Sequence, residues 1–326
     1  VLRAGGYNVG IYSSPYLEVF NERIEFDGKY ITDGELETIT DRVCSAADKM
    51  VSEGKESPTE FEIVTAIAFL YFKEKGADYV VLEVGLGGRG DSTNIVKEPL
   101  CSVVTSISLD HTDRLGETIP EIAMEKAGII KKGCPVVSGS RDDEAKAVLR
   151  KTATDMGAPF FDAARIVPKV VKSDMKGSVF SAEILGREHK GINISMAGDY
   201  QIDNAVTALY AIELLRKQNK TDITSREIRE GMENAKNIGR MEVLNENPWI
   251  IIDGAHNPDG AKSLKTTIEK NFKGKKILMV LGILADKEVD EVLHTFKDIT
   301  LDYVSTCPQN PRALAAAELS GKIISM

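Results

Sequence analysis

The sequence has no long apolar run. None of its apolar segments approaches the roughly 18 residues that a bilayer-spanning helix needs, and no segment has the pattern of a signal peptide. Cysteine is also scarce: the four cysteines, Cys44, Cys101, Cys134 and Cys307, are far apart and include no C-x-x-C pair. This spacing indicates free thiols in a reducing compartment. We therefore expect a cytoplasmic protein without a membrane partner.

Basic residues are not in excess. The sequence contains 41 lysines and arginines against 50 aspartates and glutamates, a formal net charge of −9, which argues against a nucleic-acid partner. Small anionic ligands remain compatible with this charge, because a helix N-terminus or a few basic side chains can hold them locally. The pattern G-x-x-x-x-G-K-[ST] is absent from these residues, so a nucleotide site built on such a loop is not among them.

What the sequence does contain is an ordinary globular composition, 42% hydrophobic and 28% charged, in a length suited to about two domains. Strand-like apolar runs alternate with amphipathic segments through Gly139, the pattern of an α/β fold with a doubly wound, mainly parallel sheet. Residues 237–240 have the character of a linker, and a fresh alternation follows them. We therefore predict a first domain over residues 1–236 and a second, smaller α/β domain over residues 237–326.

The stretch over residues 79–132 is the expected centre of the molecule. Two apolar runs, at 79–82 and 101–109, end in polar residues that include Glu83 and His111. Such runs are typical of buried strands in a parallel sheet, and open α/β sheets bind ligands at the carboxyl ends of their strands. We therefore expect Glu83 and His111 at neighbouring strand ends.

A short helix is predicted from Pro120 to just before Gly128, and it would present Lys126 near the same edge. Taken singly, each residue has an ordinary explanation: Glu83 as a half-exposed strand end, His111 as a loop histidine, and Lys126 as a solvated helix face. Their occurrence together favours a metal or catalytic site. The glycine-rich loop after Glu83 is compatible with a phosphate cradle or with a tight turn alone.

Outside this stretch, the segment DGAHNP at residues 253–258 places a carboxylate, an imidazole and an amide at the start of a predicted helix, whose N-terminus favours anions. Asn257 fits the N-cap position of that helix. Arg240, in the linker, is by itself a solvated charge. Other expected elements are helices over residues 32–52, 57–76 and 311–319, and hairpins over 166–196 that cover one edge of the sheet, with turns at 176–177 and 190–191.

A series of short motifs occurs along nearly the whole chain in a specific order and spacing. They read YNVGIYSSPYL, ERI, EVGLGGRGDSTN, SLDHTDRLGETIPEIAMEKAGIIKKGCPVV, DNA, GRMEVL, DGAHNP and NPRAL. In these motifs the sequence resembles the folylpolyglutamate synthase / dihydrofolate synthase family, a branch of the Mur ligase superfamily. The resemblance implies a Mur ligase-like ATP-binding domain followed by a smaller Rossmann-like α/β domain.

The resemblance also implies ATP-dependent amide formation. A folate or dihydropteroate carboxylate takes the γ-phosphate of ATP, and the amine of L-glutamate attacks the resulting acyl phosphate. Magnesium would neutralise the phosphate charge and prefers oxygen ligands. By this resemblance, Ser14 and Glu83 are ligands of one Mg²⁺, and His111 serves a second Mg²⁺ together with Lys126. The counterpart of Lys126 in the family is carbamylated, which turns a cation into a carboxylate.

Further roles are implied position by position. Asn204 and Arg240 would hold ATP, and Asp253 and His256 would complete the nucleotide and glutamate side of the cleft. Thr59, Phe61 and Glu62 would lie beside the pterin, because an aromatic face suits a flat heterocycle. Domain closure would bring residues 240–256 onto the metals, so the linker is expected to be a hinge. The expected catalytic residues are Lys126, His111, Asp253 and His256.

The sequence departs from the family pattern at several positions. The family's phosphate loop is expected upstream of Val1, so we expect the chain as given to bind ATP poorly, and the second domain is expected to be short at its end. Tyr16 stands where the family usually has histidine, and Glu288 stands where it has aspartate. Gly90 and Ser92 are small changes in the glycine loop. We do not expect these substitutions to abolish activity.

The main hypothesis is a monomeric ligase that adds L-glutamate to dihydropteroate, to (tetrahydro)folate, or to both. One alternative is another Mur-type ligase acting on a cell-wall nucleotide precursor, against which stands the SPTEFE segment at residues 57–62. The other is a non-catalytic protein that binds folate. Retention of Glu83, His111 and Lys126 together argues against that, because no structural reason requires all three.

Overall fold

The computed structural model describes residues 1–300 and 302–326. Its helices are α1 (Asp33–Ser52), α2 (Glu60–Lys75), α3 (Thr112–Leu115), α4 (Ile119–Ala127), α5 (Asp143–Asp155), α6 (Asp199–Lys217), α7 (Ser225–Glu233), α8 (Pro258–Asn271), α9 (Val289–Phe296) and α10 (Ala316–Ser325). Its strands are β1 (Val9–Tyr12), β2 (Ile24–Phe26), β3 (Lys29–Tyr30), β4 (Tyr79–Leu82), β5 (Ser102–Val104), β6 (Val136–Ser138), β7 (Phe160–Asp162), β8 (Lys169–Asp174), β9 (Gly177–Ile184), β10 (Arg187–Ile194), β11 (Glu242–Glu246), β12 (Trp249–Ile252), β13 (Leu278–Leu281) and β14 (Asp302–Ser305).

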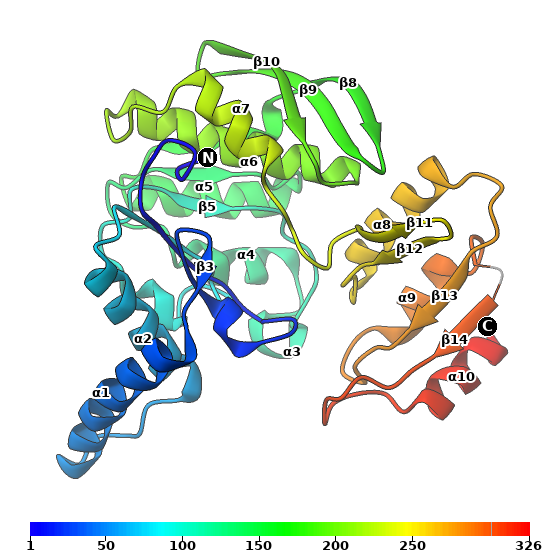
Figure 1. Cartoon of the computed structure of the whole chain (residues 1–326), viewed down its shortest axis with the longest axis horizontal. Coiled ribbons are helices and arrows are strands. Elements are labelled where there is room, and N and C mark those ends of the chain that lie inside the picture. Colours follow the sequence, from blue (N-terminus) through cyan, green and yellow to red (C-terminus); the bar gives the residue numbers. More distant parts are fainter. Residues whose placement is uncertain (301) are drawn as a thin grey trace.

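Two α/β units lie side by side and are joined by the segment between α7 and β11 (Figure 1). The boundary that we predicted at residue 236 falls in this segment. Parallel strand pairs occur in both units: β1 with β4, β5 with β6 and β6 with β7 in the first, and β13 with β14 in the second. The α/β class is therefore confirmed. No helix among the described residues combines the length and apolar character that a membrane span requires.

The parallel strands of the first unit are divided between two sheets. One sheet has the order β3-β2-β1-β4, and the other has the order β5-β6-β7. In the described residues, β4 and β5 are edge strands of these separate sheets. Glu83 and His111 therefore follow strands that are not hydrogen-bonded neighbours, which corrects the expected placement.

Helices α1 and α2 begin and end as their sequences predict. Thr32 and Thr59 each form a capping box with the glutamate three residues later, and Gly76 ends α2 with a left-handed φ of 67°. Beside them, the first sheet and α2 bury Tyr12, Ile24 and Phe72 almost completely. Burial of each such side chain contributes about 1.5–3 kcal/mol.

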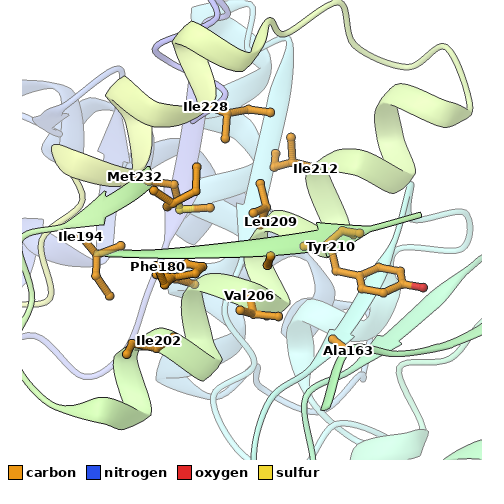
Figure 2. Packing of buried hydrophobic residues seen from close by; sticks show 14 of the residues in the cluster. Ala163, Phe180, Ile194, Ile202, Val206, Leu209, Tyr210, Ile212, Ile228 and Met232 are labelled. Atoms are coloured by element: carbon orange, nitrogen blue, oxygen red, sulfur yellow. The ribbon is translucent and has the colours of Figure 1, made fainter. Parts of the chain in front are cut away.

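Helix α6 is buried on nearly all sides. It packs between Val137 of β6 and the antiparallel sheet β10-β9-β8, whose Phe180 and Ile194 contact the same core (Figure 2). A helix that is apolar around most of its circumference is stable only when covered in this way. The predicted hairpins over residues 166–196 thus lie on α6 and do not cover an edge of the parallel sheet, because their alternating apolar residues pack against this helix.

One predicted hairpin turn is wrong. The chain reverses at Leu185 and Gly186, between β9 and β10, and both residues have positive φ. Residues 190–191, where the turn was predicted, lie inside β10, where the pairing register shifts between His189 and Ile192. Gly191, with a φ of 59°, accommodates this bulge.

Beside the bulge, the side chains of His189, Glu213 and Arg216 form a buried polar cluster, here called the His189 cluster. The imidazole Nε2 of His189 lies 3.1 Å from Oε1 of Glu213, and Nη1 of Arg216 lies 2.8 Å from the same oxygen. The His189 contact has the distance of an ion pair without the angle of a hydrogen bond, since Nε2 has no hydrogen-bond partner in the described chain. The cluster lies wholly within the first unit.

Two further element predictions needed correction. The strand expected over residues 101–109 is limited to β5, because β6 offers only three paired residues and the amide of Gly139 donates to the carbonyl oxygen of Val104 at the end of the ladder. The helix expected over residues 311–319 begins only at Ala316. Residues just before it pair in extended form with 283–285, as in the bond from Leu314 N to Ile283 O of 3.0 Å. The sequence also predicts a strand over residues 301–306; residue 301 lies outside the described residues, and β14 covers Asp302–Ser305.

The second unit has its own core. Helices α8, α9 and α10 pack around Val292, Phe296 and Leu319, which are almost fully buried. The antiparallel pair β11-β12 enters this unit directly after the linker, and α8 follows β12. The unit thereby presents the start of α8 toward the first unit.

Candidate active site

The end of β1 and the end of β4 meet because the two strands are parallel and in register, with Tyr12 opposite Leu82. This register lets the amide of Ser14 donate a hydrogen bond of 2.9 Å to Oε2 of Glu83. Burial raises the pKa of the Glu83 carboxyl, while the Ser14 bond and the charge of Arg240 oppose that rise. A half-buried carboxylate beside a hydroxyl residue is a suitable donor set for Mg²⁺, which keeps waters and phosphate oxygens as its other ligands.

The glycine-rich loop after Glu83 is a packing element in this structure. The carboxylate of Asp91 accepts the amides of Gly85 and Leu86 at 3.0 Å each, so these amides are not free for a phosphate. A Cβ added at Gly88 would lie 2.9 Å from the carbonyl oxygen of Glu125. These contacts show a tight turn that packs the loop against α4, and a phosphate role for the rest of the loop stays a prediction.

Lys126 lies in the last turn of α4, which ends at Gly128 as predicted. Burial lowers the pKa of its amine, and the charge of Asp110 opposes that shift. Because burial disfavours the ammonium form, a larger fraction of the amine is neutral than in water. A neutral amine is the form that can react with CO₂, so the environment is compatible with carbamylation.

His111 stands in a left-handed backbone conformation, with φ of 51° and ψ of 41°, directly before α3. Its amide donates a 2.9 Å hydrogen bond to Oδ1 of the preceding Asp110. Burial lowers the pKa of the His111 imidazole, with Asp110 opposing. The neutral imidazole is the metal-binding form, and uncommon backbone conformations of this kind concentrate at functional sites.

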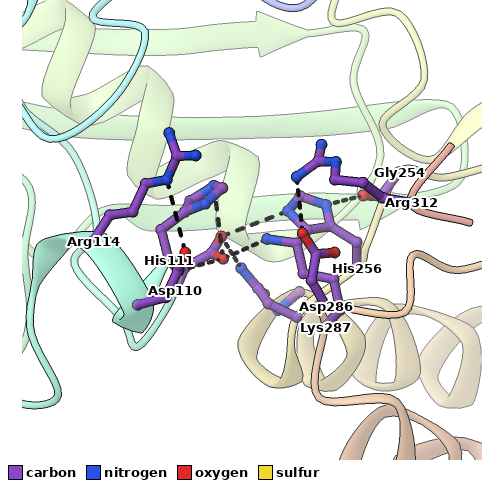
Figure 3. A network of polar contacts seen from close by, with 11 residues as sticks. Asp110, His111, Arg114, Gly254, His256, Asp286, Lys287 and Arg312 are labelled. Atoms are coloured by element: carbon purple, nitrogen blue, oxygen red, sulfur yellow. Dashed lines mark hydrogen bonds and ion pairs between the residues drawn. The ribbon is translucent and has the colours of Figure 1, made fainter. Parts of the chain in front are cut away.

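Asp110 joins the two units. Three groups of the second unit face its carboxylate: Asn257 Nδ2 at 3.0 Å, Lys287 Nζ at 2.8 Å and His256 Nε2 at 3.5 Å (Figure 3). Burial would raise the pKa of this carboxyl, but the donors of the second unit outweigh burial and hold the pKa well below its usual range. Asp110, His256, Asn257 and Lys287 are called the Asp110 cluster below.

Asp110 and Lys287 were not among the predicted site residues. A carboxylate at the end of an apolar run, next to His111, was a usable signal for Asp110. No feature of the residues next to Lys287 predicts its contact with Asp110, because that contact depends on the packing of the two units. Asn257 is the N-cap of α8, as predicted, and accepts the amide of Gly260 at 2.8 Å.

The segment DGAHNP folds back onto the linker. Asp253 accepts the amides of Met241 and Ala255, each at 2.8 Å, and the amide of Gly254 donates to the carbonyl of Gly239 at 2.8 Å. Asp253 thereby ties the end of the linker to the second unit. Arg240 is exposed and lies close to Gly254.

His256 is oriented by its own backbone. Its Nδ1 lies 2.8 Å from the carbonyl oxygen of Gly254, which only a protonated Nδ1 can satisfy. Its Nε2 is then directed at the carboxylate of Asp110, 3.5 Å away in the first unit.

The remaining predicted site residues lie farther from the Asp110 cluster in the fold. Asn204 is exposed on α6 and donates to Oε1 of Gln201 at 3.2 Å. Thr59 and Glu62 satisfy each other as the capping box of α2, so these side chains already have a structural task. The ring of Phe61 lies 5.9 Å from that of Tyr12 and against the backbone of Gly85.

Of the predicted metal ligands, Ser14 and Glu83 are in contact, whereas His111 and Lys126 are each influenced by the charge of Asp110. Within residues 1–300 and 302–326, no three histidine, cysteine, aspartate or glutamate side chains converge as a ready metal cage.

Comparisons with known proteins agree with this architecture. The Mur ligase middle domain matches residues 35–212, and the Mur ligase, glutamate ligase domain matches residues 239–325. The dihydrofolate synthase/folylpolyglutamate synthase of Bacillus subtilis is 38% identical over 98% of this chain and 74% of its own length.

Solved structures are also similar to this chain over nearly its whole length. The folylpolyglutamate synthase of Mycobacterium tuberculosis in complex with ADP is 30% identical, with a TM-score of 0.90 over 99% of this chain and 73% of that one. A folylpolyglutamate synthase in complex with AMPPCP and folate is 33% identical, with a TM-score of 0.88 over 99% of this chain and 79% of that one. The chain therefore belongs to the folylpolyglutamate synthase / dihydrofolate synthase family of the Mur ligase superfamily.

Proposed function

We propose that this protein is an ATP-dependent ligase that adds L-glutamate to dihydropteroate, to (tetrahydro)folate, or to both, through an acyl phosphate. The pteroate or folate carboxylate attacks the γ-phosphorus of ATP and ADP leaves. The amine of L-glutamate then attacks the acyl carbon, and phosphate departs with the bonding electrons while the amine loses a proton. Family membership supports this reaction.

The observation that carries the proposal is the Asp110 cluster. It brings the DGAHNP segment of the second unit against His111 of the first. Two substrates that react with each other need surfaces from both units, and closure of such a site excludes water from a hydrolysable acyl phosphate. A contact across the units at the predicted catalytic histidines is what this chemistry requires.

Residues of the first unit would provide the phosphate side of the site. We assign Ser14 and Glu83 to one Mg²⁺ and His111 with a carbamylated Lys126 to a second. Bound Mg²⁺ would neutralise charge on the transferring phosphoryl group. Lys126 contributes a buried amine with a lowered pKa, which is the property that carbamylation needs. His111 contributes an imidazole kept neutral by burial.

Residues of the linker and second unit would complete the site. We assign Asn204, Arg240 and Asp253 to ATP, and His256 to the glutamate side of the site. Thr59, Phe61 and Glu62 are assigned to the pterin side. We further propose that the enzyme acts as a monomer in the cytoplasm, and that it makes and extends folates for one-carbon metabolism.

The test uses the protein produced from the complete open reading frame that contains these residues. Phosphate release is measured with ATP, Mg²⁺, L-glutamate and either dihydropteroate or tetrahydrofolate, beside Lys126→Ala and the surface control His294→Ala. We expect turnover that requires Mg²⁺ and glutamate, survives in His294→Ala and is lost in Lys126→Ala. The better pterin substrate then names the activity.

Two outcomes would contradict the proposal. Turnover with a uridine-nucleotide peptide precursor and none with either pterin would favour a cell-wall ligase. Binding of folate without phosphate release under any of these conditions would favour a non-catalytic role. The carbamate has its own test: incubation with ¹³C-bicarbonate should give a carbamate carbon signal by NMR that is absent from Lys126→Ala.

A further inference from the structure

We propose that Asp110 is a positioning residue that holds the second unit in its working orientation through Lys287 and Asn257, and that this contact exists before any substrate binds. The catalytic consequence rests on the proposed function, but the contact itself does not. We do not assign Asp110 as a metal ligand, and its effect on the site is exerted through the residues that it contacts, His111 among them.

The geometry of the carboxylate supports this role. Oδ1 of Asp110 accepts Nζ of Lys287 at 2.8 Å, and Oδ2 accepts Nδ2 of Asn257 at 3.0 Å. The two donors come from different elements of the second unit, the loop before α9 and the N-cap of α8. Because two separate elements of the second unit hold the two oxygens of one carboxylate, the contact restricts both the rotation of the second unit and its distance from the first unit.

The contact is also the most desolvated ion pair that joins the two units. The side chain of Lys287 is 10% exposed and that of Asp110 is 25% exposed. By contrast, the pair of Lys270 with Asp199, which also bridges the units, has side chains that are 40% and 54% exposed. Exposed pairs contribute little, whereas loss of one partner from a buried pair leaves an uncompensated charge.

Asp110 further links the docking of the second unit to His111. The same Oδ1 that accepts Lys287 also accepts the amide of His111 at 2.9 Å. That amide belongs to a residue held in the left-handed region, which needs support from its surroundings. Departure of the second unit would therefore release Asp110 and loosen the backbone that aims the His111 imidazole.

The decisive experiment measures domain orientation without substrates. Donor and acceptor dyes are placed at the exposed loop positions 55 and 273, one in each unit, and single-molecule energy transfer gives the ratio of closed to open molecules. The variants are Asp110→Asn, Lys287→Met and the double substitution. Asp199→Asn, Lys270→Met and their combination are the matched controls at the exposed pair. Circular dichroism confirms that each variant folds.

We expect each single variant of the Asp110 pair to lower the closed-to-open ratio by at least about tenfold, with no further loss in the double variant. Lys287→Arg, which keeps the charge, should recover most of the closed population. The control variants should change the ratio by less than about twofold. Unchanged ratios in folded Asp110→Asn and Lys287→Met, or additive effects in the double variant, would overturn the proposal.

The same variants in the assay separate this inference from the proposed function. In an active ligase, Asp110→Asn should lower kcat by at least about tenfold while the KM for ATP changes little, because Asp110 orients the second unit and is not itself assigned to the nucleotide. If no variant or wild type turns over, the proposed function fails, and the energy-transfer result still decides the role of Asp110. If Asp110→Asn opens the molecule and leaves kcat unchanged, the contact positions no catalytic group.

Discussion

Two polar clusters of this protein use similar groups in different settings. In the His189 cluster, the carboxylate of Glu213 meets an imidazole and a guanidinium, and the side chains of His189 and Glu213 are only 2% and 6% exposed. In the Asp110 cluster, a carboxylate meets an imidazole and an ammonium, but its side chain is 25% exposed and its partners belong to the other unit. One cluster is closed within a unit, and the other spans two.

The comparison separates stability from orientation. The contacts of the His189 cluster are buried inside one unit and break only when the core around them opens. This cluster therefore contributes to the free energy of unfolding. The contacts of the Asp110 cluster join the two units and can break while each unit stays folded. The Asp110 cluster is therefore suited to a step in a reaction cycle, and each prediction below tests one side of this contrast.

The largest effect is expected for Glu213→Ala. Removal of this carboxylate leaves the mostly buried guanidinium of Arg216 without a counter-charge, which should lower the free energy of unfolding by about 3 kcal/mol. Thermal unfolding followed by circular dichroism should show a drop of roughly 6–12 °C in Tm. Glu188→Ala, at an exposed pair with Lys190, is the control and should leave Tm nearly unchanged. Equal Tm values for the two variants would contradict the expectation that the buried cluster stabilises the fold more than the exposed pair does.

His111→Ala should have the opposite profile. We expect loss of about a hundredfold in kcat/KM, the order seen when one electrostatic contact to the transition state is removed, with a nearly unchanged Tm. Steady-state assays of phosphate release measure the first quantity and calorimetry the second. His294→Ala, an exposed histidine of α9, provides the matched control. A large fall in Tm for His111→Ala would mean that the residue serves the fold instead.

The pH dependence of stability should report on His189. Burial lowers the pKa of its imidazole, and the charge of Glu213 opposes this while Arg187 and Arg216 reinforce it, as does Arg229. Because the unfolded chain then binds the proton more readily, stability is complete above the unfolded pKa of about 6.5 and is lost as pH falls through the folded pKa. We expect Tm to fall more steeply from pH 7.5 to pH 5.5 in the wild type than in His189→Gln. An equal fall of Tm with pH in both proteins would show that His189 is not responsible for this pH dependence.

The smallest effect is expected at the exposed bridge between the units. Lys270→Met should change the free energy of unfolding by no more than about 0.5 kcal/mol, because water screens this pair. Urea titration measures it, and Lys287→Met is the comparison. A change at Lys270 as large as that at Lys287 would show that burial does not distinguish the two contacts.

Local signals predicted the fold well where they act within a few residues. The bounds of α1, the end of α2 at Gly76, the end of α4 at Gly128 and the N-cap at Asn257 all depend on chemistry a few positions apart, and all were found. The misplaced turn at 190–191 and the late start of α10 depend on pairing with distant strands. Such partners cannot be identified from a local pattern, because cross-strand register and burial override propensity.

The residues of the candidate site were likewise predicted where a local signal marks them, and were missed where their contacts depend on distant partners. Residues that end apolar runs, such as Glu83 and His111, stand out in the sequence because a carboxylate or imidazole is unusual there. Lys287 does not stand out, since its partner Asp110 lies 177 positions away and the pair forms only when the two units meet. The roles of individual site residues in catalysis stay predictions until the variants are measured.

The hydrogen bonds from Asp253 and Gly254 to the linker have a mechanical consequence. Because residues 239–241 are hydrogen-bonded to the second unit, the hinge that we predicted would be confined to the few residues between the end of α7 and Gly239. If the second unit rotates about this hinge, residues close to it would move little, whereas β14 and α10, which lie farther from it, would move most (Figure 1). A rotation of a given angle would thus displace the DGAHNP segment least and the far helices most.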